Sequence, residues 1–177
     1  MVAATTRTST RSVFEGSIHS VVTRCGVASR EILAAQSGLE FLQGIGEGRN
    51  GYPPISDTLN FYALLAEPGR VVFQGEPKYE FYNPIGSVHG GWACTLMDSC
   101  LACAVHTMVP KGRAYTTVEL KINMLRMITT ETGPLRAEGK VVQVGGQIGV
   151  AEGRLYDVDD KMYAFATTTC LLFDIKQ

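Results

Sequence analysis

The segment Asn83-Pro-Ile-Gly-Ser-Val-His-Gly-Gly-Trp-Ala-Cys-Thr-Leu-Met-Asp98 leads into an almost unbroken run of small and apolar residues that ends at Val109. A helix over this run would be hydrophobic on every side, so we expect it to be buried rather than amphipathic. Asp98 is the one acidic residue inside the run. An unpaired carboxylate in an apolar helix costs on the order of several kcal/mol unless it finds donors or takes up a proton. We therefore expect a specific set of groups to face Asp98.

The composition describes one soluble domain. The chain has 177 residues, 45% of them hydrophobic, which is enough for one substantial core. A net charge of -1 gives no electrostatic reason to expect nucleic acid or a membrane as a partner. No apolar stretch reaches membrane-spanning length, because Asp98 and His106 interrupt the longest one. The five cysteines are odd in number and indicate reduced thiols, hence a cytoplasmic protein.

Residues 1–50 are expected to form an N-terminal extension, and residues 51–177 the main domain. The first twelve residues are rich in Thr, Ser and Arg and contain no acid, which favours a disordered extension over a transit peptide. The apolar spacing from Ser29 to Leu42 predicts one or two short helices, interrupted near Ser37 and Gly38. A loop is expected over residues 44–54, followed by one helical turn at 55–59.

Strand patterns lie on both sides of the predicted helix. Residues 61–65 and 71–73 should pair as a hairpin around Glu67-Pro-Gly-Arg70, with the second strand extending to Tyr82. After the helix, the alternation from Ala114 to Leu125 predicts a long half-buried strand, with Val118 and Leu120 on the face opposite Thr117. Three further strands would form a meander at about residues 135–144, 148–156 and 162–173. Such strands can bury one long helix only if the sheet curls around it, so the expected class is α+β.

The motifs occur in a specific order: Asn83-Pro-Ile-Gly86, His89-Gly90-Gly91, Asp98 and then Thr116-Thr-Val-Glu-Leu120. This combination resembles the hot-dog-fold acyl-CoA thioesterases of the phenylacetate-pathway PaaI type, over roughly residues 54–174. The resemblance implies a curled antiparallel sheet of five to six strands around one central helix at about residues 90–108. It also implies an acyl-CoA partner as substrate, no cofactor beyond the CoA of the substrate itself, and no metal.

The start of the predicted helix can stabilise the transition state of thioester hydrolysis. Its first backbone N–H groups have no intrahelical acceptor, so they can bind the oxyanion that forms at the carbonyl. The resemblance assigns this role to Gly90. Asp98 lies ~12 Å further along the helix, too far for both groups of one chain to hold the same carbonyl easily. The resemblance resolves this distance with a site shared across a homodimer, which is expected to assemble further into a homotetramer.

The resemblance implies that Asp98 acts either as a nucleophile, giving a mixed anhydride, or as a general base that activates water. The sequence leaves both roles open. Asn83 resembles the amide residue that orients the aspartate or the thioester. Thr117 resembles the hydroxyl residue that positions the water, although its neighbour Thr116 also remains a candidate.

The other predicted substrate-binding residues are His89, Gly91, Trp92 and Thr116. The His89 side chain has no acid or cysteine partner nearby in sequence, which favours a hydrogen bond within its loop over a chemical role. Gln147 stands where related enzymes often carry a basic residue, so CoA phosphates would fall to bases such as Lys111 or Arg113.

Two other classes of hot-dog protein were weighed. Hydratases and dehydratases need a His paired with an acid, but Cys103 occupies both positions at which the second group would stand. A non-catalytic acyl-CoA sensor is the alternative function, although residues 1–50 contain no basic recognition helix. The expected substrate is an aryl-acyl or short- to medium-chain acyl-CoA.

Overall fold

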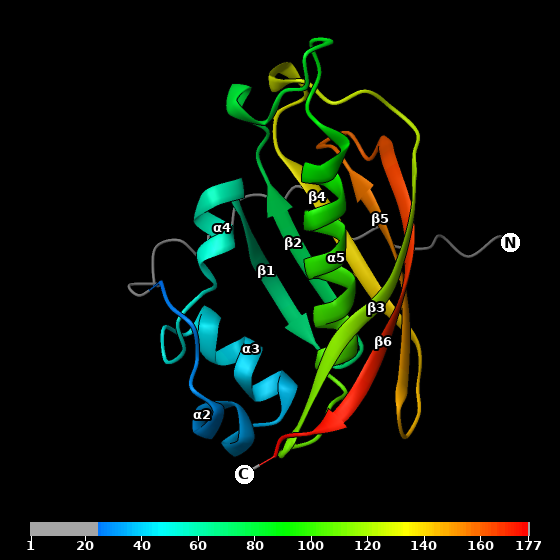
Figure 1. The fold of residues 1–177 in the computed structure, drawn as a ribbon. Coiled ribbons are helices and arrows are strands. Elements are labelled where there is room, and N and C mark those ends of the chain that lie inside the picture. The colour runs from blue at the N-terminus through cyan, green and yellow to red at the C-terminus, as the bar shows by residue number, and fades with distance from the viewer. Residues whose placement is uncertain (1–24, 177) are drawn as a thin grey trace, which may run out of the picture.

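The structure, a computed structural model, describes residues 25–176. One long helix, α5 (Gly90–His106), lies against a curled sheet of six antiparallel strands (Figure 1). The strands are β1 (Phe61–Glu67), β2 (Arg70–Gly75), β3 (Arg113–Met124), β4 (Leu135–Val144), β5 (Ile148–Tyr156) and β6 (Met162–Asp174). The predicted α+β class and the single central helix are confirmed.

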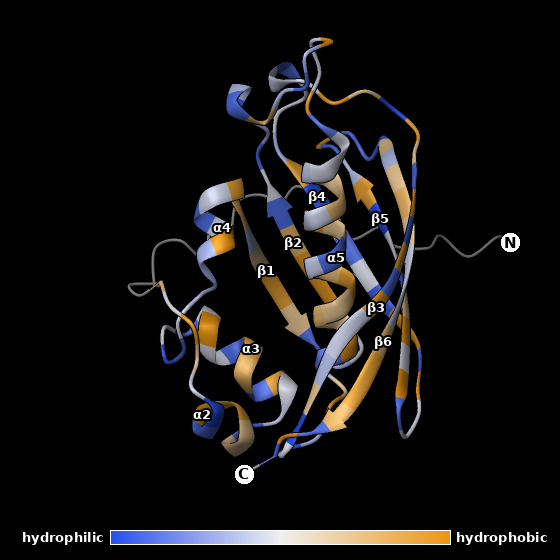
Figure 2. Ribbon diagram, in the orientation of Figure 1, coloured by the Kyte–Doolittle hydropathy of each residue, from blue (hydrophilic) through white to orange (hydrophobic). Residues whose placement is uncertain are grey.

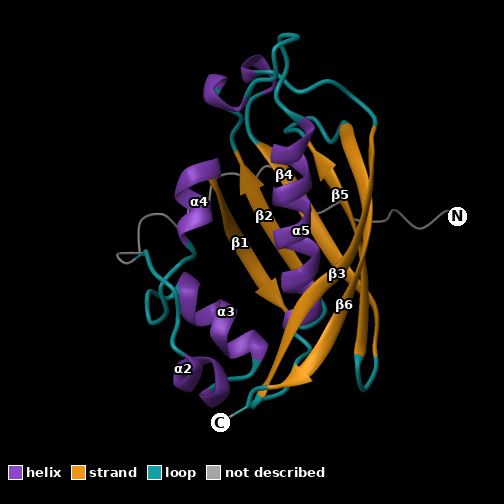
Figure 3. Ribbon diagram, in the orientation of Figure 1, coloured by secondary structure: helices purple, strands orange, loops and turns teal. Residues whose placement is uncertain are grey.

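The sheet follows the order β1-β2-β4-β5-β6-β3 (Figure 3). The hairpin before α5 forms one edge, the predicted meander β4-β5-β6 forms the middle, and β3 returns to pair with β6. The strand β3 therefore forms the other edge of this sheet. In this order β3, the strand after α5, is separated by β4, β5 and β6 from the β1–β2 hairpin that comes before α5.

The core lies where α5 packs on the sheet. Leu96, Met97, Leu101 and Val105 have no exposed surface, which fits a helix that is apolar around most of its circumference. Figure 2 colours most of α5 between white and orange, in contrast to the mixed colours of α3. The helix backbone lies very close to β4, because a Cβ on Gly139 would be only 2.9 Å from the carbonyl oxygen of Cys100.

A β-bulge changes the predicted faces of β3. The pairing of β3 with β6 shifts register between Thr117 and Glu119. Val118 is consequently 56% exposed, whereas Thr117 and Leu120 are both partly buried. The predicted strict alternation, with Thr117 and Leu120 on opposite faces, is therefore wrong at this point, because a bulge adds one residue to one strand only.

Three short helices precede the sheet: α2 (Arg30–Ala35), α3 (Gly38–Gly46) and α4 (Pro54–Leu59). In Figure 1, α3 and α4 lie beside β1 and α2 lies next to α3. Ser37 caps α3 with a capping box and separates it from α2, as the interruption near Ser37 predicted. The strand β2 ends at Gly75 rather than at the predicted Tyr82, and a short 3-10 turn, Tyr79–Phe81, follows it.

The prediction for the first twelve residues lies outside the described residues. Within residues 25–176, no helix is both long and apolar enough to cross a membrane.

Candidate functional site

A hydrogen bond joins the middle of α5 to β3. Thr117 Oγ1 donates to Asp98 Oδ1 at 2.9 Å. Both side chains are partly buried, on the side of α5 that does not face the middle of the sheet. Thr117 pairs with the buried Cys170 of β6 and lies on the face toward the helix, whereas Thr116 pairs with the exposed Leu171 and lies on the other face. The structure thus brings Thr117, and not Thr116, to Asp98.

The thiols near Asp98 are poor nucleophiles. Burial raises the pKa of Cys103 to about 12, and the Asp98 charge adds to this shift. Burial and then the same charge raise the pKa of Cys94 above its ordinary value. A thiol with a raised pKa carries little thiolate at neutral pH. The carboxylate of Asp98 is therefore the stronger candidate for chemistry at this position.

The start of α5 presents a free backbone donor. His89 Nδ1 accepts a hydrogen bond from the N–H of Gly91 at 2.9 Å, and the N–H of Trp92 donates to the carbonyl oxygen of His89 at 2.9 Å. Within residues 25–176, no acceptor binds the N–H of Gly90. His89 therefore acts as the cap of the helix, and Gly90 keeps the donor that the sequence predicted for an oxyanion.

Gly90 lines a cavity of about 460 Å³. A Cβ at this position would lie 2.7 Å from Met124 Cε, so the absence of a side chain lets Met124 pack closely against the start of the helix. Its φ is not in the left-handed region, so the backbone conformation itself does not require glycine. The glycine is best explained by the close approach of another group to its backbone, which a side chain would prevent.

Asn83 organises the loop that leads into α5. Its Oδ1 accepts from the N–H groups of Ile85 and Ser87, at 3.1 and 3.2 Å, and its Nδ2 donates to Ser87 Oγ at 2.9 Å. These bonds close a turn in which the amide side chain replaces backbone partners. Asn83 also lines the cavity beside Gly90. Asn83 therefore lies next to the start of α5 and not next to Asp98.

Trp92 belongs to the core. Its side chain is 3% exposed, its indole N–H donates to the carbonyl oxygen of Leu59 at 2.8 Å, and its ring stacks on Phe81. His89 and Gly91 are exposed at the helix start. Trp92, His89 and Gly91 do not line the cavity at Gly90.

Sequence reasoning missed part of this cavity. Met124, Arg126 and Tyr163 line it together with Gly90. The first two lie at and just beyond the end of β3, and only the register of the sheet brings them to the helix start. Arg113, a predicted phosphate ligand, instead donates to Asp174 at 3.0 Å and to the carbonyl oxygen of Gly146 at 2.7 Å.

Asp98 does not line the cavity that contains Gly90. The two groups lie on one straight helix, with more than two turns between them. Within the described residues, no group of three or more His, Cys, Asp or Glu side chains is placed to hold a metal ion.

Comparison with known proteins places these residues in a family. The sequence profile of the thioesterase superfamily matches residues 85–164, which include Gly90, Asp98 and Thr117. A "Putative esterase" of Halobacterium salinarum is 42% identical over 69 residues, which are 38% of this chain and 44% of that protein. The match thus spans less than half the length of that relative. A "Putative esterase" of Saccharolobus solfataricus is 36% identical over 108 residues, 61% of this chain and 75% of that protein.

Solved structures share the fold. A crystal structure from Ralstonia eutropha JMP134, titled "putative thioesterase, phenylacetic acid degradation-related protein", superposes with a TM-score of 0.68 and 25% identity, covering 74% of this chain and 98% of that one. The Escherichia coli PaaI protein superposes with a TM-score of 0.61 and 22% identity, covering 67% and 83%. At that identity the PaaI match supports the hot-dog fold alone.

The two sequence relatives support membership of a family, which the shared fold alone does not. The Saccharolobus protein aligns over 75% of its own length, and the family profile spans all of α5, β3, β4 and β5 and the start of β6. The chain therefore belongs to the thioesterase superfamily.

Proposed function

We propose that this protein is an acyl-CoA thioesterase of the PaaI type, which hydrolyses an aryl-acyl or short- to medium-chain acyl-CoA to the free acid and CoA. The observation that carries this proposal is the 2.9 Å hydrogen bond from Thr117 to Asp98. It fixes the orientation of a partly buried carboxylate within the region that matches the thioesterase superfamily. The named relatives, two of them "Putative esterase" and one related to phenylacetic acid degradation, support the same activity.

In this proposal the N–H of Gly90 binds the thioester oxygen. Negative charge develops on that oxygen as the carbonyl carbon is attacked, and a free N–H at a helix N-terminus stabilises it. The hydrogen bond from Gly91 to His89 holds the first turn in place. The Gly90 donor therefore needs little rearrangement during the reaction.

Asp98 would supply the attacking group. The hydrogen bond from Thr117 occupies Oδ1, which leaves Oδ2 available. Oδ2 either attacks the carbonyl carbon, expelling CoA thiolate and leaving a mixed anhydride that water hydrolyses, or accepts a proton from the water that attacks. Both routes end in a carboxylic acid and CoA, and Thr117 orients the carboxylate in each.

Two chains would complete the site. Gly90 and Asp98 are separated by ~12 Å along one helix, so a single thioester carbonyl cannot easily reach both groups of the same chain. We propose that Gly90 of one protomer acts with Asp98 of its partner. The outer edge of β3 has no strand partner among residues 25–176, and Val118 on that strand is 56% exposed. An edge of this kind is suited to pairing with a second copy.

Arg126 is our candidate for the CoA phosphates. It lines the Gly90 cavity, it is exposed, and it makes no ion pair with any residue from 25 to 176. Arg113, in contrast, is already paired with Asp174. A guanidinium at the cavity mouth can form paired hydrogen bonds to phosphate oxygens.

Replacement of Asp98 by Asn tests the proposal. Asn keeps the volume but cannot act as a nucleophile or accept the proton, so turnover of the best acyl-CoA should fall by ~10² or more. We expect the melting temperature to change little. The measurement is thiol release over a panel of acyl-CoAs, with Asp159→Asn, an exposed carboxylate between β5 and β6, as the matched control.

Hydrolysis by Asp98→Asn at the wild-type rate would show that the carboxylate is structural. Wild-type protein that binds acyl-CoA but releases no thiol would instead support the sensor function.

A further inference from the structure

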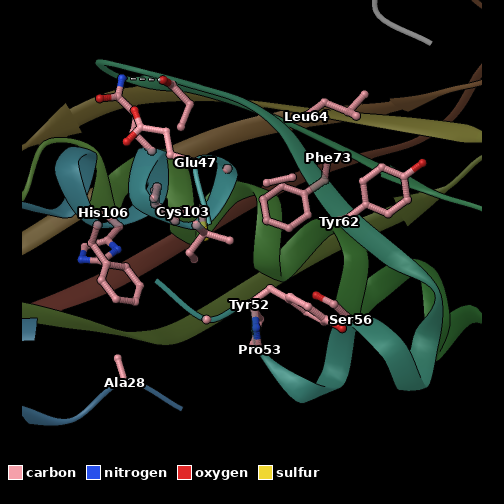
Figure 4. Close-up of a pocket in the computed structure, with 18 of the residues that line it drawn as sticks. Ala28, Glu47, Tyr52, Pro53, Ser56, Tyr62, Leu64, Phe73, Cys103 and His106 are labelled. Carbon is pink, nitrogen blue, oxygen red and sulfur yellow. Dashed lines mark hydrogen bonds between the residues drawn. The ribbon is translucent and has the colours of Figure 1, made fainter. Parts of the chain in front are cut away.

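A second cavity, of about 750 Å³, lies between the N-terminal helices, β1 and the C-terminal half of α5. Figure 4 shows Cys103 and His106 of α5 on one side, Tyr62 and Phe73 of the first hairpin on another, and Tyr52 in the loop before α4. Most of its lining comes from residues 26–66, which lie outside the segment 85–164 that matches the family profile. Residues outside the profile match therefore form most of this cavity.

The lining is suited to a hydrocarbon. Among residues 25–176, Glu47 is the one carboxylate that lines it, and it is paired with Arg49 at 2.6 Å. Burial lowers the pKa of His106 to about 4, so this imidazole is neutral at pH 7. The side-chain amide of Gln43 already donates to the carbonyl oxygen of Ala66 at 3.2 Å. A strongly polar ligand would lose its hydration here without matching partners, which is costly.

The cavity begins close to the proposed reaction centre of the same chain. Cys103 lies five residues after Asp98, ~7.5 Å along the helix. Tyr115 lies two residues before Thr117 on β3, ~7 Å along the strand and on the same face. The Sγ of Cys103 and the hydroxyl of Tyr115 are 4.0 Å apart, and both residues line the cavity. Asp98 and Thr117 do not themselves line the cavity, and Cys103 and Tyr115 are the lining residues nearest to them along α5 and β3.

We infer that this cavity binds the acyl chain of the substrate, and that residues 26–66 thereby select a medium-chain fatty acyl group over an acetyl group. The inference rests on the proposed thioesterase function. The volume of 750 Å³ lies within the range of roughly 300 to 1,000 Å³ that is usual for small-molecule pockets. A thioester held at Asp98 would direct its chain past Cys103 and Tyr115, and its head group toward solvent.

A chain-length series tests the inference. Each methylene that enters an apolar cavity contributes enough to raise kcat/KM by roughly three- to fourfold. We expect kcat/KM of the full-length protein to rise stepwise from acetyl-CoA through butyryl- and hexanoyl- to octanoyl-CoA. Equal kcat/KM for all chain lengths, or a preference for phenylacetyl-CoA over every fatty acyl-CoA, would overturn it.

A cavity-filling variant locates the effect. Ala63 of β1 lines the cavity, so Ala63→Phe should remove most of the preference for octanoyl-CoA while acetyl-CoA hydrolysis stays within about twofold. Val150→Phe is the control, because it adds the same ring to β5 at a residue that does not line the cavity. It should leave the dependence of kcat/KM on chain length unchanged. Ala66→Leu, a smaller filling change in the same wall, replaces Ala63→Phe if that variant does not fold. If the folded cavity-filling variant keeps the wild-type dependence of kcat/KM on acyl chain length, the inference is contradicted.

A binding measurement separates this inference from the proposed function. Cis-parinaric acid, a fluorescent fatty acid, should bind the full-length wild-type protein and Asp98→Asn equally, and Ala63→Phe at least tenfold more weakly. This pattern would support the cavity as a hydrocarbon site even if no acyl-CoA is hydrolysed. No binding to wild-type protein, or equal binding to Ala63→Phe, would overturn the inference while leaving thioester hydrolysis at Asp98 to its own test.

Discussion

Gly90 has no side chain to cover its backbone N–H at the start of α5. Its neighbours Gly91 and Trp92 both donate their N–H groups to His89, whereas its own N–H has no acceptor among residues 25–176 and the residue lines a cavity. Met124 occupies the space that a Cβ would take. Gly90 therefore combines a free donor with a backbone that no side chain of its own covers, and a longer side chain would displace Met124.

The Gly90→Ala variant should separate a catalytic role from a structural one. Since φ is not in the left-handed region, alanine strains no backbone, and the flexible end of Met124 can move aside. We expect folding and assembly to be retained. The added methyl group should obstruct the approach to the N–H, so kcat/KM for the best acyl-CoA should fall by ~10-fold to 10³-fold.

Displacement of Met124 is the competing explanation for such a loss. The double variant Gly90→Ala/Met124→Ala removes that contact but keeps the methyl group beside the N–H. Recovery of activity relative to Met124→Ala alone would show that the obstruction was Met124. If folded Gly90→Ala keeps full activity, the oxyanion donor is a group other than the N–H of Gly90.

At the level of elements, the position of α5 depends on small residues beneath it. A Cβ on Gly139 of β4 would lie 2.9 Å from the carbonyl oxygen of Cys100 and 3.2 Å from its sulfur. Cys100 is fully buried and its thiol donates to the carbonyl oxygens of Val71 and Ala137, at 3.4 and 3.3 Å. This contact holds the middle of the helix, which carries Asp98, at a fixed height above the sheet.

Gly139→Ala should therefore destabilise the protein. The obstructing atom is a backbone oxygen that cannot rotate away, so the helix must shift, at a cost of roughly 1–3 kcal/mol. Urea denaturation monitored by tryptophan fluorescence measures this loss. Gly146→Ala in the β4–β5 turn, where no atom lies within 4 Å of the new Cβ and φ is not left-handed, is the matched control. Equal stability of the two variants would show that α5 moves freely over β4.

At the level of the whole molecule, the proposed site requires two chains. The sheet ends at β3, while its other edge, β1, is covered by α3 and α4. On and beyond β3, Val118, Met124 and Leu125 are 56%, 49% and 48% exposed. Apolar exposure along an open strand indicates a surface that another protomer covers.

We predict that dimers form by edge-to-edge pairing of β3 and associate further into tetramers. Light scattering after size exclusion at micromolar concentration should give a mass above that of the monomer. Val118→Lys, which puts a charge on the open edge, should shift the protein toward monomer and lower activity together; Lys is common on natural edge strands that avoid pairing. A monomer of undiminished activity would contradict the shared site.

The amino-acid sequence by itself determined most of the elements. An apolar run with one carboxylate predicted a buried helix with Asp98 at its centre, and the turn residues at 145–146 and 158–161 predicted β4 and β5 with their observed bounds. These properties are local, because hydrophobic periodicity and turn residues act over a few positions. The predicted extension of β2 to Tyr82 was wrong, since pairing and not composition ends that strand at Gly75.

Only the tertiary structure decided which side chains meet. The resemblance favoured Thr117 and left Thr116 as a candidate, and the pairing of β3 with β6 places Thr117 on the face toward α5, where it bonds Asp98. The wall that residues 26–66 add to the cavity likewise has no sequence pattern of its own, because it forms where α3 and β1 pack beside α5. Register and packing depend on partners distant in the chain, so the periodicity of one segment cannot specify them.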